Sequence, residues 1–138
     1  MSDETITAAR DFLARHHRGV ITTYRADGRA QSSPVVAGIA PDGRLHISAT
    51  APRAKTRNAR RRPYATFCGF TEGFFGSWAQ VEGRIDVIDQ PEAMELLVAL
   101  YRSIAGEHPD WDDYREAMVR EQRCVLALSI ERAVVVAR

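Results

Sequence analysis

The sequence contains little cysteine, a single lysine and no long apolar run. Cys68 and Cys124 stand in apolar, strand-like stretches without metal-ligand spacing, so we interpret both as reduced core residues of a cytoplasmic protein. No stretch approaches the roughly 20 apolar residues of a membrane-spanning helix. The polar N-terminus does not resemble a signal peptide. A formal net charge of +1 gives no overall field that would favour nucleic acid or a membrane surface.

The remaining composition is that of one globular domain over residues 1–138. Hydrophobic residues make up 45% of the chain and charged residues 27%, which is typical of a folded rather than a disordered protein. A chain of this length can bury its own hydrophobic core. We find no internal repeat, low-complexity segment or linker that would divide it.

Hydrophobic periodicity and turn residues predict a mainly β protein with inserted helices. We expect strands over residues 19–25, 31–40, 44–50, 64–70, 77–89 and 124–136, and helices over 3–18, 52–62, 91–105 and 110–123. Ser2 or Asp3 can cap the first helix, and Gly19 is expected to end it. Short turns between successive strands favour an antiparallel barrel of about six strands.

Two strands carry more specific signals. Pro34 cannot donate a hydrogen bond to a neighbouring strand, so its strand should lie at an edge or at a bulge. The near-continuous apolar run at 125–128 favours a strand in the middle of the sheet. Trp78 lies on the polar face of its strand, either as a cross-strand contact or as one wall of a site for a flat ligand.

The segment 48–62 predicts an anion-binding site. A strand leads to Thr50, which offers a hydroxyl cap, and Pro52 suits the first helical position. Free backbone N–H groups at the helix start, the helix dipole, Arg53 and Lys55 would then meet at one place, most plausibly around a phosphate. The basic run 53–62 also raises the hypothesis of nucleic-acid binding, but no aromatic residues alternate with its charges, so we disfavour that hypothesis.

Two other segments contain residue types that occur in functional sites. His16 and His17 are adjacent and point to different sides of a helix, so we predict no metal site there. The loop 71–76 places two phenylalanines between glycines, which is consistent with a packed hairpin tip or with the mobile edge of a pocket. The sequence does not decide between these two interpretations.

Three segments resemble one known family. The motif Pro-Arg-Ala-Lys-Thr-Arg-Asn-x-Arg-Arg at 52–61, the pair Glu82-Gly83 and the segment 99–118 are similar to the split-barrel flavin/deazaflavin oxidoreductases related to pyridoxamine 5′-phosphate oxidase. The segment 99–118 resembles in particular the actinobacterial branch that binds coenzyme F420, a deazaflavin. The resemblance implies a six-stranded antiparallel split barrel, and a homodimer with two cofactor sites at the subunit interface.

The same resemblance implies a set of cofactor-binding residues. The phosphate would lie at Arg53 and Lys55 and at the backbone around Ala51, with Thr56 and Asn58 in the same motif. The ring would lie against the strands, at Gln31, Ser33, Val35, Ser48, Ala49, Thr50, Trp78 and Gln80. No residue stands out as a catalytic acid, and Tyr24 or solvent could deliver a proton.

The leading functional hypothesis is an F420-dependent reductase that transfers hydride to a conjugated, electron-poor small molecule such as a quinone, bilin or enone. One alternative is an FMN-binding relative that uses the same anion site. Another is a protein that binds F420 without turnover and serves as a carrier. The physiological acceptor depends on loop shapes that the sequence does not reveal.

Overall fold

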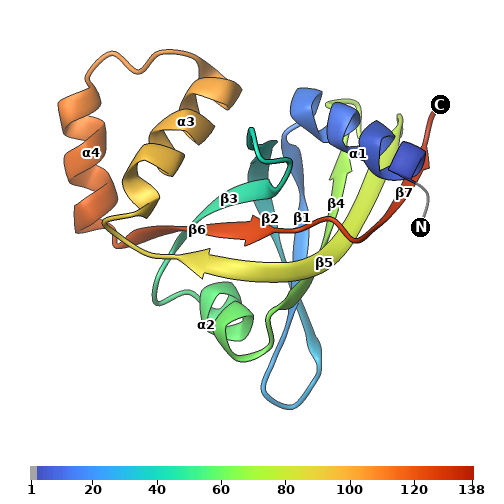
Figure 1. Ribbon diagram of the computed structural model, residues 1–138, viewed down its shortest axis with the longest axis horizontal. Helices are drawn as coiled ribbons and strands as arrows, with labels where there is room; N and C mark the ends of the chain where they lie inside the picture. Colours follow the sequence, from blue (N-terminus) through green and yellow to red (C-terminus); the bar gives the residue numbers. More distant parts are fainter. Residues whose placement is uncertain (1–2) are drawn as a thin grey trace.

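A computed structural model of the protein describes residues 3–138. The described helices are α1 (Asp3–Arg15), α2 (Ala54–Arg61), α3 (Ala93–Ala105) and α4 (Trp111–Arg120). The described strands are β1 (Arg18–Tyr24), β2 (Ala30–Ile39), β3 (Leu45–Thr50), β4 (Tyr64–Phe70), β5 (Trp78–Ile88), β6 (Arg123–Leu128) and β7 (Arg132–Val136). Figure 1 shows the strands at the centre, with α1 at one end and the α3–α4 pair at the other.

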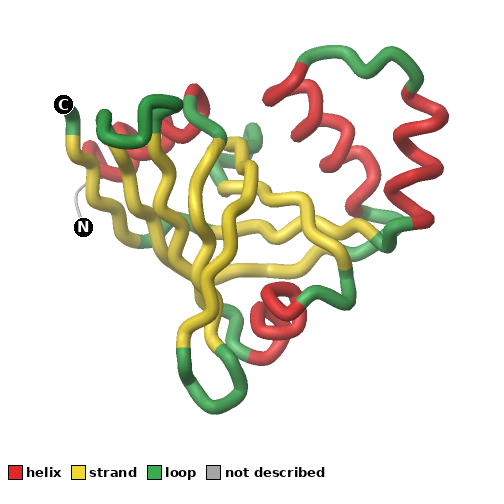
Figure 2. The backbone as a smooth tube through the Cα atoms, turned by 180° about the vertical axis from the view of Figure 1, so that it is seen from behind, coloured by secondary structure: helices red, strands yellow, loops and turns green. Residues whose placement is uncertain are grey.

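The strands close into an antiparallel barrel. They follow the order β4-β1-β2-β3-β6-β5-β7, and an additional β4–β5 pairing closes the circle around six of them. The seventh, β7, pairs with the first half of β5, on the edge opposite the one that pairs with β4. The structure therefore confirms the predicted split-barrel architecture, with one extra strand at its rim (Figure 2).

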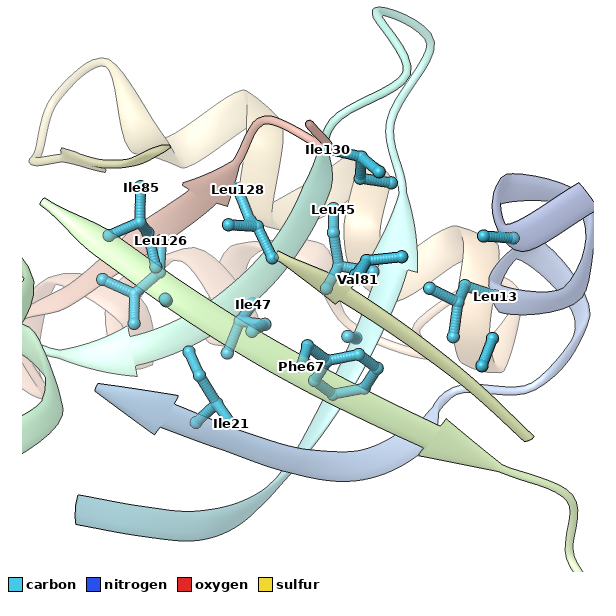
Figure 3. Packing of buried hydrophobic residues seen from close by; sticks show 14 of the residues in the cluster. Leu13, Ile21, Leu45, Ile47, Phe67, Val81, Ile85, Leu126, Leu128 and Ile130 are labelled. Atoms are coloured by element: carbon cyan, nitrogen blue, oxygen red, sulfur yellow. The ribbon is translucent and has the colours of Figure 1, made fainter. Parts of the chain in front are cut away.

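Alternate residues of the strands fill the barrel interior. Ile47, Phe67 and Val81 are fully buried and come from three different strands, as Figure 3 shows. Successive side chains of a strand point to opposite faces, so the neighbours of these residues point outward, toward helices or solvent. Leu13 of α1 closes one end of this core.

The helices cover different parts of the barrel. α3 contacts the outer faces of β6, β2 and β3, and α4 contacts β6. Leu97 and Met118 join Val125 and Ala127 in a second, smaller hydrophobic cluster between these helices and β6. α2 crosses β1 and β5, below the barrel in the view of Figure 1.

The first helix is shorter than predicted. It ends at Arg15 rather than at Gly19, because Arg18 and Gly19 already pair with both β2 and β4. His17 consequently lies beyond the helix, where its Nδ1 is 2.9 Å from the carbonyl oxygen of Ala37. The proposed Ser2 cap lies outside the described residues.

The second and third predicted helices also begin later than expected. α2 begins at Ala54, with Arg53 as its N-cap residue and no side-chain cap, so Thr50 does not cap it and Pro52 lies before it. α3 begins two residues after Pro91, at Ala93. The last helix begins behind an Asp110 cap that accepts a hydrogen bond from the Asp113 N–H (3.1 Å).

The predicted C-terminal strand 124–136 is two strands. β6 pairs with the second half of β5, and β7 pairs with its first half. The regular pairing with β5 is therefore interrupted between β6 and β7. Gly83 stands at this interruption, and a Cβ there would lie 1.9 Å from the Ser129 carbonyl oxygen. The backbone continues to follow β5 through Ser129 N to Arg84 O (2.8 Å) and Glu131 N to Glu82 O (2.9 Å). The apolar run is central, as predicted, because β6 lies between β3 and β5.

β2 and β3 separate after a short pairing. Across the described chain their register covers only Ala37 to Ile39, and Pro34 lies on the separated part of β2. The Ala37 N–H donates to His17 O (2.7 Å), on the side of β2 that faces β1. Alternate residues of an antiparallel strand direct their N–H groups to the same side. The Pro34 nitrogen therefore faces away from β1, on the open side of β2. The strand as a whole lies between β1 and β3, so the predicted edge is found only along the half of β2 that does not pair with β3.

Candidate functional site

The opening between β2 and β3 is a cleft of about 550 Å³. One side is the separated part of β2, the other is the end of β3, and the start of α2 borders both. The lining residues are Ser33, Pro34, Val35, Val36, Ser48, Ala49, Thr50, Arg53, Lys55 and Arg123. Three of them are cationic and none is acidic, so the cleft is suited to an anion.

The turn from β3 into α2 brings these cations together. Thr56, in the first turn of the helix, is fully buried, and its hydroxyl donates to the Thr50 carbonyl oxygen (2.9 Å). The Arg53 N–H bonds to the same oxygen (3.1 Å). Thr56 thus fixes the strand-to-helix turn from behind, while Arg53 and Lys55 extend into the cleft.

The Lys55 ammonium lies close to two other cations. Burial, with the neighbouring charges of Arg53 and Arg123, lowers the pKa of the Lys55 ammonium from its ordinary value. Within residues 3–138, neither Arg53 nor Lys55 forms a side-chain hydrogen bond or an ion pair. A bound anion would relieve this repulsion, because an opposite charge favours the charged form of an amine.

Arg123 also lines this cleft, whereas the sequence predicts it at the end of the helix 110–123. It is the first residue of β6 and pairs with Thr50 of β3. Its Nε is 2.9 Å from Oε1 of Glu121, so part of its charge is already compensated. The register of β6 against β3 locates it, and a single sequence carries no local signal for that register.

A second, apolar pocket of about 290 Å³ adjoins the cationic cleft. The two share Val36, Ser48 and Arg123. The other lining residues of the apolar pocket come from α3 and α4: Leu97, Leu100, Tyr101, Ile104, Ala105, Tyr114 and Met118. Tyr114 donates its hydroxyl to Leu97 O (3.0 Å), and burial raises the pKa of that hydroxyl. Neither Tyr101 nor Tyr114 is among the site residues predicted from the sequence.

Several predicted site residues lie elsewhere. Asn58 faces the opposite side of α2, where its Nδ2 donates to Thr23 Oγ1 (3.2 Å) and to Gln31 Oε1 (3.1 Å). Trp78 and Gln80 of β5 pair with β4 and β7 and do not line the cleft. Ala51 lies beside the cleft, with its N–H bonded to Gln122 O (2.9 Å).

The remaining candidate features give no second site of this kind. Phe74 and Phe75, at the tip between β4 and β5, are 62% and 85% exposed, and their rings contact each other edge-on at 4.9 Å. Within the described chain, no group of three or more His, Cys, Asp or Glu residues could hold a metal ion. No described helix is long and apolar enough to cross a membrane. Both cysteines are free thiols.

Comparison with known proteins identifies the family. The family profile described as pyridoxamine 5′-phosphate oxidase matches residues 6–137, nearly the whole chain. The chain belongs to the pyridoxamine 5′-phosphate oxidase family. The cationic cleft is therefore part of a flavin-binding, PNPOx-like split barrel.

Solved structures share this fold at low sequence identity. A conserved hypothetical protein from Mycobacterium tuberculosis is 19% identical, with a TM-score of 0.79 over 99% of this chain and 85% of that one. A protein described as an F420 reductase is also 19% identical, with a TM-score of 0.69 over 91% and 94%. A pyridoxamine 5′-phosphate oxidase-related, FMN-binding protein from Nostoc punctiforme is 16% identical, with a TM-score of 0.66 over 96% and 80%.

Proposed function

We propose that this PNPOx-family protein is an oxidoreductase that binds coenzyme F420 in the opening between β2 and β3 and transfers hydride to a conjugated, electron-poor small molecule. The observation that carries the proposal is the cleft itself. Arg53, Lys55 and Arg123 stand at its cationic part, and an apolar pocket adjoins it. A ligand with a phosphate and a flat ring needs these two environments side by side.

The residues present fit such a cofactor. Arg53 and Lys55 would hold the phosphate at the start of α2, where backbone N–H groups and the helix dipole also favour negative charge. The separated strands would bind the edge of the ring, because Val36 and Ser48 stand where β2 and β3 no longer pair. A bound deazaflavin supplies a hydride from carbon, and the protein has to orient the acceptor against it.

The proton for the acceptor is assigned to solvent. The cleft and the apolar pocket are lined by no carboxylate and no histidine within the described chain. Tyr24, the other candidate donor, lines neither, and its ring lies 6.5 Å from the ring of Tyr64. With no carboxylic acid or histidine on these walls, and with the Tyr114 hydroxyl already donating to Leu97 O, the proposed chemistry depends on binding and orientation.

The choice of F420 rather than FMN rests on the α3–α4 region. The segment 99–118, which resembles the F420-binding branch, contributes Leu100, Tyr101, Ile104, Ala105, Tyr114 and Met118 to the apolar pocket. One solved structure of the same fold is described as an F420 reductase. The alternative is FMN, since another is described as FMN-binding and the cationic cleft would hold either phosphate.

A homodimer is part of this proposal. Val36 and Val134 are each 47% exposed, and the separated half of β2 has one neighbouring strand. A second copy packed against these residues would bury them and could bring its Trp78 and Gln80 to the cofactor ring. Light scattering after size-exclusion chromatography measures the mass, and a monomer at micromolar concentration would contradict this part.

A parallel titration with both cofactors tests the function. We expect oxidised F420 to lose fluorescence on binding at micromolar protein, and FMN to bind more weakly. A protein that purifies yellow and binds FMN but not F420 would establish the FMN alternative. Reduced F420 should then be oxidised by members of a panel of quinones, bilins and nitroaromatics. Tight F420 binding with no turnover across that panel would instead support a carrier.

A further inference from the structure

A separate cleft of about 310 Å³ lies under the other side of α3. It is lined by Ile39 at the end of β2, Ala40 and Pro41 of the following turn, His46 of β3, and Leu96, Ala99, Leu100 and Ser103 of α3. Leu100 is the one residue that it shares with the apolar pocket beside the cofactor cleft. Its volume is at the lower end of the roughly 300–1,000 Å³ range of ligand pockets.

The floor and the rim of this cleft differ in exposure. His46 and Leu100 are buried, whereas Ala99 and Ser103 are exposed and Leu96 is half-buried. The Ser103 hydroxyl already donates to the Leu100 carbonyl oxygen (2.8 Å). No lining residue carries a full charge, so the walls are apolar apart from the Ser103 hydroxyl, which is already bonded, and one buried imidazole.

That imidazole is an unsatisfied polar group. His46 is 3% exposed, and its Nε2 is buried without a hydrogen-bond partner among the described residues. Leu45 and Ile47 point into the barrel core, so the alternation of β3 directs His46 outward, beneath α3. A buried polar atom without a partner costs roughly 1–3 kcal/mol, which a ligand atom could remove.

The imidazole is best described as neutral. Burial lowers the pKa of His46, and the opposing charges of Asp42 and Arg44 act on it in opposite directions. A neutral ring presents one donor and one acceptor nitrogen. A hydroxyl group can pair with Nε2 in either tautomer, because it both donates and accepts. A charged ligand would find no opposite charge on the lining of the cleft.

We infer that this cleft is a second ligand site, which takes a small, neutral molecule with an aromatic or alicyclic body and one hydroxyl group directed at His46. The apolar walls bind the body and exclude ions, and the imidazole selects the hydroxyl. The site is distinct from the proposed cofactor site, since it shares no residue with the cationic cleft and only Leu100 with the apolar pocket.

The test uses 2-naphthol and its hydroxyl-free analogue naphthalene as probes. We expect wild-type protein to bind 2-naphthol roughly fivefold to tenfold more tightly than naphthalene, the value of one net hydrogen bond. Binding should be followed by calorimetry. NMR should show contacts from the probe to the His46 ring and to the methyl groups of Leu96, which lines this cleft and not the apolar pocket. Equal affinity for the two probes, or contacts elsewhere, would overturn the inference.

Variants separate this site from non-specific binding. Ala99→Trp should fill the cleft from its exposed rim and reduce 2-naphthol affinity at least tenfold. Ala14→Trp makes the same change at an exposed alanine of α1 and should leave binding unchanged. His46→Leu should keep naphthalene binding and lose the preference for the hydroxyl. An unchanged preference in His46→Leu, or equal binding by both tryptophan variants, would contradict the proposal.

Discussion

The two faces of α2 use polar side chains in opposite ways. Lys55 faces the cationic cleft, has no ion-pair partner among the described residues, and has its pKa lowered by burial and by neighbouring cations. Asn58 faces the barrel, is 4% exposed, and donates to both Thr23 and Gln31. The satisfied face attaches the helix, and the unsatisfied face is available to a ligand. We therefore expect the Asn58 face of α2 to affect stability and the Lys55 face to affect the binding of the proposed cofactor.

The largest expected effect is on the face toward the cleft. Replacing Lys55 by alanine should weaken F420 or FMN binding by about 1.5–3 kcal/mol, the range for a hydrogen bond to a charged group. The urea midpoint should not fall, because the substitution removes a half-buried charge. Cofactor titration and urea unfolding measure the two quantities.

Arg57→Ala is the matched control for that variant. Arg57 is exposed on the same helix and lines a different cleft, beside Gln31 and Asn58. The Arg57→Ala variant should bind the cofactor with the affinity of the wild-type protein. Equal losses in the two variants would mean that the cations of α2 act only through their general charge.

Asn58→Ala should show the converse pattern. Removing the amide leaves the fully buried hydroxyl of Thr23 without this partner, which we expect to cost about 1–3 kcal/mol of unfolding free energy. The affinity of the folded protein for cofactor should be unchanged. A loss of affinity comparable to that of the lysine variant, measured well below the urea transition, would show that the two faces are not separate.

The pH dependence of binding gives an intermediate effect. In the free protein the pKa of Lys55 is below its ordinary value, and a bound phosphate would raise it again. Binding then takes up protons between the two pKa values, and affinity falls as pH rises through that window. Lys55→Arg should bind without this decline, because arginine stays protonated. Titrations from neutral to alkaline pH compare the two proteins, and a decline of the same size in both would contradict the assignment.

The same lowered pKa has a consequence for stability. Charged Lys55 is less favourable in the folded than in the unfolded chain, so this cost is present below the folded-state pKa and disappears as pH rises above it. In the absence of ligand, the unfolding free energy of the wild-type protein should therefore increase slightly with pH, compared with that of Lys55→Ala. Urea unfolding at a series of pH values measures this.

The smallest expected effect is at Arg123. Its guanidinium is partly exposed and already paired with Glu121, and exposed ion pairs of this kind contribute about 0–1 kcal/mol. Arg123→Ala should weaken cofactor binding by less than about 1 kcal/mol. Glu121→Gln should strengthen it slightly, because the arginine charge is then free for the ligand. A loss as large as that of Lys55→Ala would make Arg123 the principal anion ligand.

Local sequence signals predicted most of the barrel. The strand 64–70 has the predicted bounds, and the alternation of Ala79, Val81 and Ile85 places them inside, because both depend on side-chain periodicity alone. The division of the C-terminal segment into β6 and β7 depends on the backbone approaching Gly83 of another strand. Periodicity within the segment carries no information about that approach.

The site divides in the same way. Seven predicted residues line the cleft together: Ser33, Val35, Ser48, Ala49, Thr50, Arg53 and Lys55. They follow from the strand-to-helix motif and its neighbouring strand. Gln31, Thr56 and Asn58 are held in hydrogen bonds behind that cleft, and a motif cannot say which side of a helix each of its members faces. Arg123 and the apolar pocket required the relative placement of β6, α3 and α4.

Pro34 has one further consequence. The side of β2 that leaves β3 is the place where an additional strand could otherwise join by main-chain hydrogen bonds, as in fibrous aggregates. Its ring nitrogen has no hydrogen to give on that side, so a row of copies joined strand to strand is interrupted from the outset. In the homodimer proposed above, contacts along this edge should accordingly be made by side chains rather than by strand addition.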